Sequence, residues 1–358
     1  MSLPASANAS WRRAKQPYDF QNDERGAAVK GMAAVDRETV VFAIVLTGTI
    51  EAQIQLARAV GFPLLVKPAR GGGGIGMIAV TNEAELGPAL LRAAALAQRS
   101  FACADVYVER LLQRPRHIEF QIIADQYGNA MHLYERDCSV QRRHQKVIEE
   151  AVAPNIERGV VDALAGRAAS ILGNMGYDNI GTVETLYDTD AGFSFLEINT
   201  RLQVEHGVTE EVTGIDIVQA QIRLAAGAKL STVIPLRPEV SGHAIQLRIY
   251  AEDPVRFIPS PGVLETFVLP EGPGLRVETG YAAGCKVTPY YDPMLAKLIV
   301  KDANRSQAIA RALDALGQTS IVGLKTNIPF LEKVLRSEPF QNGAVDTQFA
   351  QYIAATPG

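Results

Sequence analysis

The stretch FLEINTRLQVEH, from Phe195 to His206, alternates polar and apolar side chains along almost its whole length. Successive side chains of a β-strand point to opposite faces, so residues two apart share one face. The pattern predicts a single extended segment with one polar face. That face carries Glu197, Asn199, Arg201, Gln203 and Glu205. A strand face that only meets water is the ordinary alternative.

The residue types on this polar face are those of a metal and oxyanion site. Mg²⁺ takes oxygen ligands, commonly one or two carboxylates together with substrate phosphates. Glu197 and Asn199 offer a carboxylate and an amide oxygen two residues apart. The planar guanidinium of Arg201 suits a small oxyanion. We therefore interpret the segment as functional.

A glycine-rich segment lies upstream, in GFPLLVKPARGGGGIGM from Gly61 to Met77. Its apolar start predicts a short strand that ends in Lys67, and the glycines that follow predict a phosphate loop. Glycines let backbone N–H groups approach phosphate oxygens closely, and a lysine adds a point charge. No Lys-Ser or Lys-Thr follows the glycines, so this is not a Walker A loop. A mobile linker is the open alternative.

Three further strands are expected at residues 106–110, 117–124 and 130–135, followed by a charged loop. The loop contains Arg142, Arg143, His144, Gln145 and Lys146. A solvated turn is the usual interpretation of such a run. The alternative is a contact with anionic oxygens. The carboxylates nearby, at 135, 149 and 150, argue against a nucleic-acid surface.

Seven segments together resemble a known family. In chain order they are KPARGGGGIGM, RHIEFQ, ERDCSVQRRHQKVIEEA, FLEINTRLQVEH, HAIQLRIYAEDP, SPG and YYDPMLAKLIV. They resemble the ATP-grasp and C-terminal portions of biotin carboxylase, from about Gly61 to the end of the chain. The resemblance implies an α+β fold, in which an ATP-grasp domain precedes a biotin carboxylase C-terminal domain. The N-terminal nucleotide-fold domain of the family is expected to be mostly absent.

The resemblance implies a nucleotide site for ATP. Lys67 would contact the phosphates, and a lid with Gly72, Gly73 and Gly74 would fold over the nucleotide. The adenine would meet Glu109 and the backbone near Leu111, and His117 would reach the ribose and phosphates. The residues over the phosphates and bicarbonate would be Gln141, His144 and Lys146.

The resemblance also implies a metal site and a carboxylation site. One or two Mg²⁺ or Mn²⁺ ions would be held by Glu184, Glu197 and Asn199. Bicarbonate would be held by Arg201, Gln203 and Val204. Glu205 would act as its general base, and Arg248 would face the ureido oxygen of biotin. The implied reaction is ATP-dependent carboxylation of biotin on a carrier protein, through carboxyphosphate.

Composition agrees with such an enzyme. A chain of 358 residues can bury a sizeable core, and its formal net charge of -4 argues against general affinity for nucleic acid or an anionic membrane. The three cysteines lack metal-binding spacing, which favours a reduced, cytoplasmic location. No apolar run approaches the roughly 20 residues of a membrane span. The first 25 residues resemble an irregular leader without an export signal.

The glycine and proline residues and the helix end signals along the chain predict its organisation. We expect a leader and N-terminal domain remnant over residues 1–50, a small ATP-grasp lobe over 51–135, a large lobe over 136–238 and the C-terminal domain over 239–358. A strand is expected at 40–46. Helices are expected at 26–34, 51–60, 83–98, 155–175, 215–226, 303–316 and 327–335.

Three departures from the family pattern bear on activity. The sequence Asn22, Asp23, Glu24 stands where the family has Gly-Asp-Lys, which would place a carboxylate toward ATP phosphates. Ile75 stands in the glycine loop where many relatives carry a cation. Gly207 stands where proline is common, after the expected base.

Three functions stay open on the sequence. The first is the biotin carboxylase component of an acetyl-CoA, propionyl-CoA, pyruvate or urea carboxylase. The second is a non-catalytic remnant that keeps the fold and binds ATP poorly. The third is another ATP-grasp ligase, such as a carbamoyl-phosphate or purine-pathway enzyme, although HAIQLRIYAEDP and YYDPMLAKLIV argue against it.

The partners also follow from the resemblance. The chain has no Met-Lys-Met biotinylation signal, so the biotin carboxyl carrier protein and the carboxyltransferase are expected on separate chains. Relatives often pair as homodimers, but the sequence leaves the oligomeric state open. It also does not identify the final acyl acceptor.

Overall fold

The structure is a computed structural model that describes residues 44–46, 48–58, 60–70, 76–143, 145–236 and 238–356. Several predictions from the sequence lie outside these residues. They are the helix at 26–34, the departures at 22–24 and Ile75, the lid glycines Gly72, Gly73 and Gly74, and His144.

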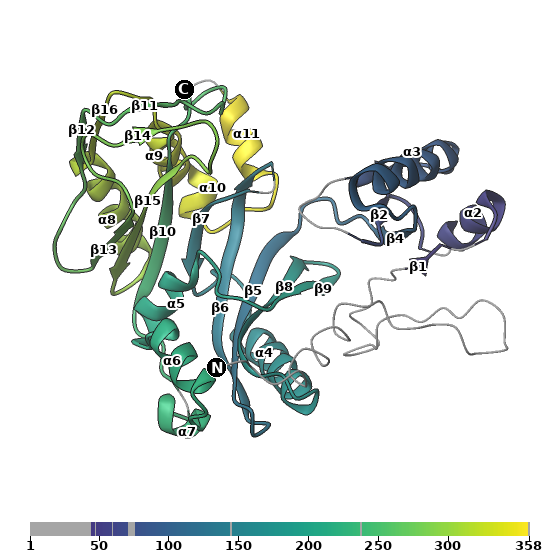
Figure 1. Ribbon diagram of the computed structural model, residues 1–358, viewed down its shortest axis with the longest axis horizontal. Helices are drawn as coiled ribbons and strands as arrows, with labels where there is room; N and C mark the ends of the chain where they lie inside the picture. Colours follow the sequence, from purple (N-terminus) through teal and green to yellow (C-terminus); the bar gives the residue numbers. More distant parts are fainter. Residues whose placement is uncertain are drawn as a thin grey trace, which may run out of the picture.

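A small lobe stands to one side of the molecule (Figure 1). Its described strands pair in the order β1-β4-β2-β3, all antiparallel. They are β1 (Ile44–Val45), β4 (Val106–Arg110), β2 (Leu64–Pro68) and β3 (Ile78–Val80). Two helices, α2 (Ile50–Arg58) and α3 (Glu83–Phe101), belong to this lobe, and the core beneath them includes Leu64, Val66, Leu86 and Val108.

The body of the molecule is built on one antiparallel sheet. Among the described strands the order is β13-β15-β10-β7-β6-β5-β8-β9. Their bounds are β13 (Leu275–Thr279), β15 (Met294–Asp302), β10 (His243–Tyr250), β7 (Gln145–Ala151), β6 (Ala130–Arg142), β5 (Arg116–Ala124), β8 (Asn179–Asp188) and β9 (Gly192–Asn199). Small two-stranded pairings join β11 (Gly262–Val263) to β14 (Lys286–Val287), and β12 (Thr266–Val268) to β16 (Ser320–Val322).

The helices cover both faces of this sheet. On one face, α4 (Arg158–Asn174) packs on alternate residues of β5, including Ile118 and Phe120. Near the other end, α8 (Arg305–Gln318) and α9 (Ile328–Arg336) share a core with Ile245 and Leu247 of β10. The opposite face meets α5 (His206–Thr213), which packs on Ala244 and Ile299, and α6 (Ile217–Ala225). Alternation along each strand thus sends successive side chains to opposite faces, so that Ile245 and Leu247 of β10 meet α8 and α9 while Ala244 meets α5.

The expected helices at 51–60, 83–98, 155–175, 215–226, 303–316 and 327–335 are confirmed with small shifts at their ends. The sequence did not predict α5 or the short helices α7 (Leu230–Val233), α10 (Glu338–Gln341) and α11 (Phe349–Ala355). None of the helices in the described part of the chain is long and apolar enough to cross a membrane.

Two predictions about strands were wrong. The segment that contains the polar alternation is not extended throughout, because β9 ends at Asn199 and the chain then turns into α5. Polar alternation continued through the turn, so the pattern alone did not show where pairing stops. The charged run after residue 135 is not a loop. β6 continues to Arg142, and β7 begins at Gln145.

The sheets also bear on the division into domains. The small lobe ends with β4 at Arg110, whereas β5 and β6 belong to the large sheet. The expected boundary between residues 135 and 136 therefore falls inside β6. β10, β15 and β13 extend the same sheet into the C-terminal region, and the four expected domains stay a prediction.

Buried charge joins the C-terminal region to β7. The Glu150 carboxylate, 3% exposed, accepts hydrogen bonds from Arg305 Nε at 2.7 Å and lies 2.7 Å from His243 Nε2. Burial alone would raise the pKa of Glu150, but His243 and Arg305 lower it to about 2. Glu150 is therefore an ionised anchor between three segments far apart in the sequence.

Glu150→Gln is expected to lower the free energy of unfolding by about 3–5 kcal/mol, because it leaves the Arg305 guanidinium buried without its counter-charge. Urea unfolding followed by circular dichroism measures this value. Glu271→Gln, at an exposed carboxylate, is the control and should change the value by less than about 0.5 kcal/mol. Equal effects of the two substitutions would contradict the anchoring role.

Candidate active site

A row of charged residues crosses four strands of the large sheet. Arg136 on β6 lies opposite Glu119 on β5, Glu119 lies opposite Glu184 on β8, and Glu184 lies opposite Glu197 on β9. Directly opposed carboxylates destabilise a sheet unless a cation lies between or above them. Arg136 supplies one such cation, because its Nη2 lies 3.2 Å from a Glu119 oxygen. The remaining carboxylates need others.

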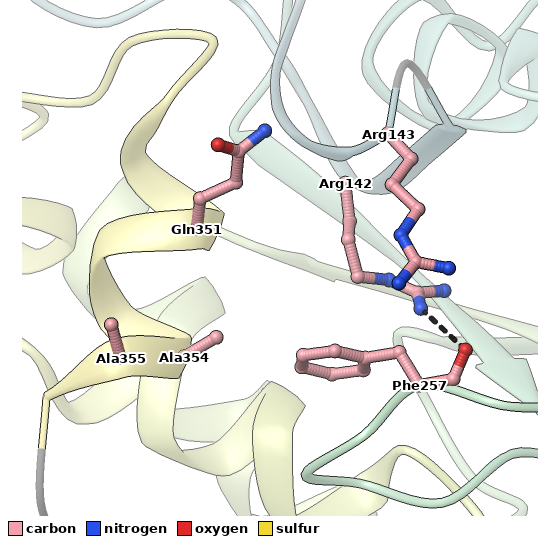
Figure 2. A pocket seen from close by; sticks show the side chains of 6 residues that line it. All are labelled: Arg142, Arg143, Phe257, Gln351, Ala354 and Ala355. Atoms are coloured by element: carbon pink, nitrogen blue, oxygen red, sulfur yellow. Dashed lines mark hydrogen bonds between the residues drawn. The ribbon is translucent and has the colours of Figure 1, made fainter.

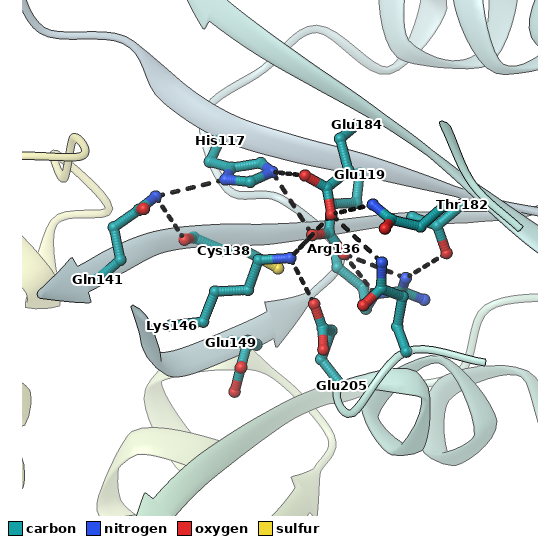
Figure 3. Close-up of polar contacts among 12 residues, drawn as sticks. His117, Glu119, Arg136, Cys138, Gln141, Lys146, Glu149, Thr182, Glu184 and Glu205 are labelled. Carbon is teal, nitrogen blue, oxygen red and sulfur yellow. Dashed lines mark hydrogen bonds and ion pairs between the residues drawn. The ribbon is translucent and has the colours of Figure 1, made fainter. Parts of the chain in front are cut away.

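Lys146 supplies the second cation, from the start of β7 (Figure 3). Its Nζ lies 2.6 Å from Glu205 and 3.2 Å from Glu184, and it also contacts Glu119. The lysine side chain is 13% exposed, and the Glu119 and Glu205 side chains are essentially buried. One ammonium thus joins carboxylates from β5, β8 and the turn before α5.

Arg248 on β10 approaches the same turn from the other side. Its Nη2 lies 3.1 Å from Glu205, and its Nε donates to Glu149 at 2.6 Å. Glu149 is fully buried and accepts a further hydrogen bond from Gln246 at 2.9 Å. Glu205 is therefore held between two cations, Lys146 and Arg248.

The surrounding charges keep both Glu205 and Glu184 ionised. Burial alone would raise the pKa of Glu205, but Lys146 and Arg248 lower it to about 2. Burial likewise opposes ionisation of Glu184, yet a hydrogen bond from His117 and the charge of Lys146 lower its pKa to about 2. Burial raises the pKa of Glu149 instead, even beside Arg248. At neutral pH, Glu205 is a proton acceptor without a bound proton.

The predicted metal ligands lie together at the edge of the sheet. Asn199 Nδ2 lies 2.9 Å from a Glu184 oxygen and 3.2 Å from a Glu197 oxygen. Glu184 and Glu197 are cross-strand partners, so two negative charges face the same space. Two carboxylates with a side-chain amide beside them are the residue types that supply the oxygen donors Mg²⁺ prefers, although it is the Asn199 nitrogen that faces the carboxylates and the oxygen lies 3.4 Å from Arg201 Nη2. The residues present therefore fit a hard divalent cation.

The predicted bicarbonate residues lie in the turn between β9 and α5. Arg201 Nη1 donates to Gln203 Oε1 at 3.0 Å, and Gln203 Nε2 lies 3.3 Å from Glu184. Arg201 is exposed, whereas Gln203 is buried. The same turn carries the exposed Arg201 guanidinium and the buried Glu205 carboxylate, a pair of groups suited to a small oxyanion that carries a proton.

The predicted nucleotide residues fall into two groups. His117 Nε2 lies 3.1 Å from Glu184, and Gln141 lies 3.3 Å from His117 Nδ1, so both belong to the charged cluster. Lys67 is in the small lobe, where it pairs with Glu109. The Leu111 amide donates to the Pro63 carbonyl at 2.9 Å, at the point where the chain leaves this lobe for β5.

Tyr107 on β4 lies directly opposite Lys67 on β2, within the small lobe. Burial raises the pKa of Tyr107, and the carboxylates of Glu109 and Glu197 raise it further. The predicted nucleotide residues thus lie in two places: Lys67, Glu109 and Leu111 in or beside the small lobe, and His117 and Gln141 in the charged cluster of the large sheet.

Sequence reasoning missed three members of the cluster: Glu119, Arg136 and Glu149. Glu119 lies two residues from His117 in RHIEFQ, so alternation placed it on the functional face and was the available signal. Arg136 and Glu149 became part of the site only through strand register, which the sequence does not reveal.

A cavity of about 470 Å³ lies elsewhere (Figure 2). It is lined by Arg142, Arg143, Phe257, Gln351, Ala354 and Ala355. Arg142 donates to Glu252 at 2.6 Å and lies over the Phe257 ring, so its charge is already compensated. The cavity contains none of the predicted site residues and is not part of the candidate active site.

Comparison with known proteins identifies the family. The family model described as the carbamoyl-phosphate synthase L chain ATP-binding domain matches residues 24–233, and that of the biotin carboxylase C-terminal domain matches residues 246–351. Biotin carboxylase 2 of Bacillus subtilis is 46% identical over 302 residues, which cover 84% of this chain and 68% of that protein. The chain belongs to the biotin carboxylase family. The resemblance and the ATP-grasp fold class inferred from the sequence are confirmed.

Other relatives agree with this assignment. The biotin carboxylase of Halalkalibacterium halodurans is 48% identical over 84% of this chain and 66% of its own length. A structure of the Campylobacter jejuni biotin carboxylase with an ATP analogue has a TM-score of 0.83 at 40% identity, covering 88% of this chain and 70% of that one. A biotin carboxylase domain from Hydrogenobacter thermophilus, solved as a dimer with MgADP, ADP and bicarbonate, has a TM-score of 0.81 at 36% identity, covering 88% and 70%.

The chain spans about two thirds of the length of these curated relatives. The match to the C-terminal domain overturns the third function considered above, an ATP-grasp ligase that shares the nucleotide lobe only. Biotin carboxylases are ligases, so the enzyme class expected from the sequence is that of the family.

The pKa values of the cluster predict acid sensitivity. The folded pKa of Glu205 is about 2, below the value of 4.5 for an ordinary glutamate. The unfolded chain therefore binds more protons than the folded chain as the pH falls from about 4.5 to 2, and the free energy of unfolding falls with it. Above pH 4.5 this contribution is fully present.

Urea unfolding at several pH values tests this prediction. Glu205→Gln should show a shallower loss of stability between pH 4.5 and 2 than the wild type, because it removes one group that must be protonated. Glu211→Gln, at a partly exposed carboxylate of α5, should keep the steep dependence. Identical pH dependence in the wild type and Glu205→Gln would contradict the assigned ionisation.

Proposed function

We propose that this chain is the biotin carboxylase component of a biotin-dependent carboxylase, which uses ATP and bicarbonate to carboxylate biotin on a carrier protein. The observation that carries the proposal is the placement of the Glu205 carboxylate. It lies between Lys146 and Arg248, at the end of the turn of residues 200–205 between β9 and α5, which we call the oxyanion turn. The proposed metal ligands at the edge of the sheet, Glu184, Glu197 and Asn199, lie nearby. A proton acceptor, an oxyanion site and a cation site thus meet in one place.

The first step is transfer of the γ-phosphoryl group to bicarbonate. Arg201, Gln203 and the Val204 amide hold bicarbonate, and ionised Glu205 accepts its proton. A bicarbonate oxygen then forms a bond to the γ-phosphorus while the bond to the ADP oxygen breaks, which gives carboxyphosphate and ADP. Such reactions depend mainly on positioning and on neutralising charge, the roles given to Lys67, His117 and Lys146.

The metal residues support the same step. Glu184, Glu197 and Asn199 would hold one or two Mg²⁺ or Mn²⁺ ions, which would neutralise charge on the ATP phosphates when bound. The side chains of this chain orient the remaining reactants. Gln141 contacts His117, and His117 contacts Glu184, so direct contacts connect two of the proposed nucleotide residues to a proposed metal ligand.

The second step is carboxylation of biotin. Carboxyphosphate breaks down to CO₂ and phosphate, and the phosphate takes the proton from the biotin N1′ nitrogen. The nitrogen then forms a bond to CO₂. The negative charge that develops on the ureido oxygen needs a nearby cation, and Arg248 is the residue assigned to it.

The partners of this reaction are part of the proposal. The biotinylated carrier and the carboxyltransferase would be separate chains, a cytoplasmic location suits the ATP and bicarbonate that the reaction consumes, and a homodimer is the proposed assembly. The relative from Hydrogenobacter thermophilus was solved as a dimer, which supports this assembly. The alternative of a non-catalytic remnant is not favoured, because the described residues assigned to the metal, the base and bicarbonate form one connected cluster with His117, Gln141 and Lys146.

Bicarbonate-dependent ATP hydrolysis tests the base. Glu205→Gln should lower this rate by about a hundredfold or more, because a general base contributes at least that factor. ATP binding should stay within about twofold of the wild type, since the amide keeps the shape of the carboxylate. Glu211→Gln on α5 is the matched control and should retain the rate. Equal losses of ATP binding and hydrolysis in Glu205→Gln would contradict the assignment.

Substitutions of the proposed metal ligand Glu197 and of the proposed biotin contact Arg248 should affect different steps. Glu197→Ala removes a metal ligand and is expected to weaken Mg²⁺-dependent ATP binding. Arg248→Lys keeps the charge beside Glu149 but loses the planar fork, so it should spare ATP binding and impair carboxylation of free biotin. Calorimetry with ATP and a radiolabelled bicarbonate assay measure the two effects. The reverse pattern would show that the two sites are wrongly assigned.

A further inference from the structure

Lys297 on β15 occupies an unusual place in the sheet. It lies directly opposite Arg248 on β10 and directly opposite Glu278 on β13. Two cations in direct opposition destabilise a sheet. The Lys297 side chain is also 10% exposed, so water screens it little. A buried lysine beside a buried arginine therefore needs a compensating partner on each side.

The partners of Lys297 lead to the oxyanion turn. Its Nζ donates to the Val204 carbonyl at 2.9 Å and lies 2.5 Å from Glu278. Arg248, its neighbour in the same row, lies 3.1 Å from the Glu205 carboxylate. One row of the sheet thus holds two successive residues of the turn, one by its backbone and the other by its side chain.

The preceding peptide of the turn is held as well. The Gln203 carbonyl lies 2.7 Å from His206 Nδ1 and accepts from the His206 amide at 3.3 Å. A trans peptide is planar, so the Val204 N–H points opposite to the Gln203 carbonyl. The Gln203 carbonyl thus sets the direction of the Val204 N–H, and the Val204 carbonyl, held by Lys297, sets the orientation of the next peptide, which leads into Glu205.

Close packing places β15 beneath this turn. Gly207, in the first turn of α5, is buried, and a Cβ atom there would lie 2.4 Å from Ile299 Cδ1. The absence of a side chain lets α5 approach β15, the strand that carries Lys297. Glycine at position 207, where proline is common in the family, is therefore compatible with a turn that packs closely on β15.

We propose that Lys297 is a positioning residue for bicarbonate: by holding the Val204 carbonyl, it fixes the peptide between Val204 and Glu205 and so keeps the Glu205 carboxylate aimed at the anion. The inference rests on the proposed function for the identity of the anion. The part of it that concerns the turn rests on the contacts of Lys297 alone. Lys297 itself touches no reacting atom.

Lys297→Met tests the role because it should change the Michaelis constants for bicarbonate and ATP differently. The Michaelis constant for bicarbonate should rise about tenfold, which corresponds to the loss of one hydrogen bond from a charged group. The constant for ATP should change by less than about twofold, because the nucleotide contacts lie elsewhere. An unchanged bicarbonate constant, or equal rises for both substrates, would overturn the proposal.

The chain offers a matched control on the same strand. Lys301 also donates to a backbone carbonyl, that of Glu211 on α5, at 2.5 Å. Lys301→Met should leave both Michaelis constants within about twofold of the wild type. A Lys301→Met variant with the same bicarbonate defect as Lys297→Met would reduce the effect to general packing of β15 and overturn the proposal.

Hydrogen exchange gives a readout that does not need activity. Amides of residues 202–206 should exchange at least about tenfold faster in Lys297→Met than in the wild type, while those of β13 keep their rates. Glu278 keeps its ion pair with Arg276 in this variant, and if the Met variant folds poorly, Lys297→Gln serves instead. Unchanged exchange in the turn would overturn the proposal. A wild type without bicarbonate-dependent ATP hydrolysis would instead contradict the proposed function, and the exchange result would then decide the positioning role.

Discussion

The ammonium of Lys146 is the group on which the rest of the site depends. Four buried carboxylates, Glu119, Glu149, Glu184 and Glu205, gather around the buried Arg136 and Arg248 and the largely buried Lys146. Lys146 alone contacts three of the four. A buried carboxylate without a cation loses far more solvation energy than it regains. Removal of the Lys146 ammonium would therefore leave uncompensated negative charge at the centre of the sheet. At the edge of the sheet, Glu197 adds negative charge that the three cations of the cluster do not balance. A divalent cation suits this position.

The continuity of the large sheet converts this charge balance into a site. β5, β8 and β9 bring the metal-edge residues, β7 brings Lys146, and β10 brings Arg248 from about a hundred positions further along the chain than β7. Because the strands are hydrogen-bonded neighbours, their side chains have little freedom to separate. The turn before α5 rests on this rigid face, which fixes where Glu205 points. A site built on strands is more precise than one built on loops.

The sequence predicted much of this arrangement for identifiable reasons. Alternation in FLEINTRLQVEH placed Glu197 and Asn199 on one face, and the structure brings both beside Glu184. The same alternation concealed the end of β9, because the turn that follows is equally polar. Glu149 and Arg136 escaped notice, since their roles depend on which strands become neighbours. Order of motifs along the chain identified the family, whereas strand register, which creates the Lys146 cluster, required the three-dimensional structure.

The most direct test of the account is calorimetric titration of the folded chain with ATP, with and without Mg²⁺. The account predicts ATP binding that depends on Mg²⁺. Without the metal ion, the carboxylates at the edge of the sheet would repel the ATP phosphates. Loss of that binding in Glu197→Ala would connect the signal to the edge. A folded chain that binds no ATP in the presence of Mg²⁺ would contradict the account.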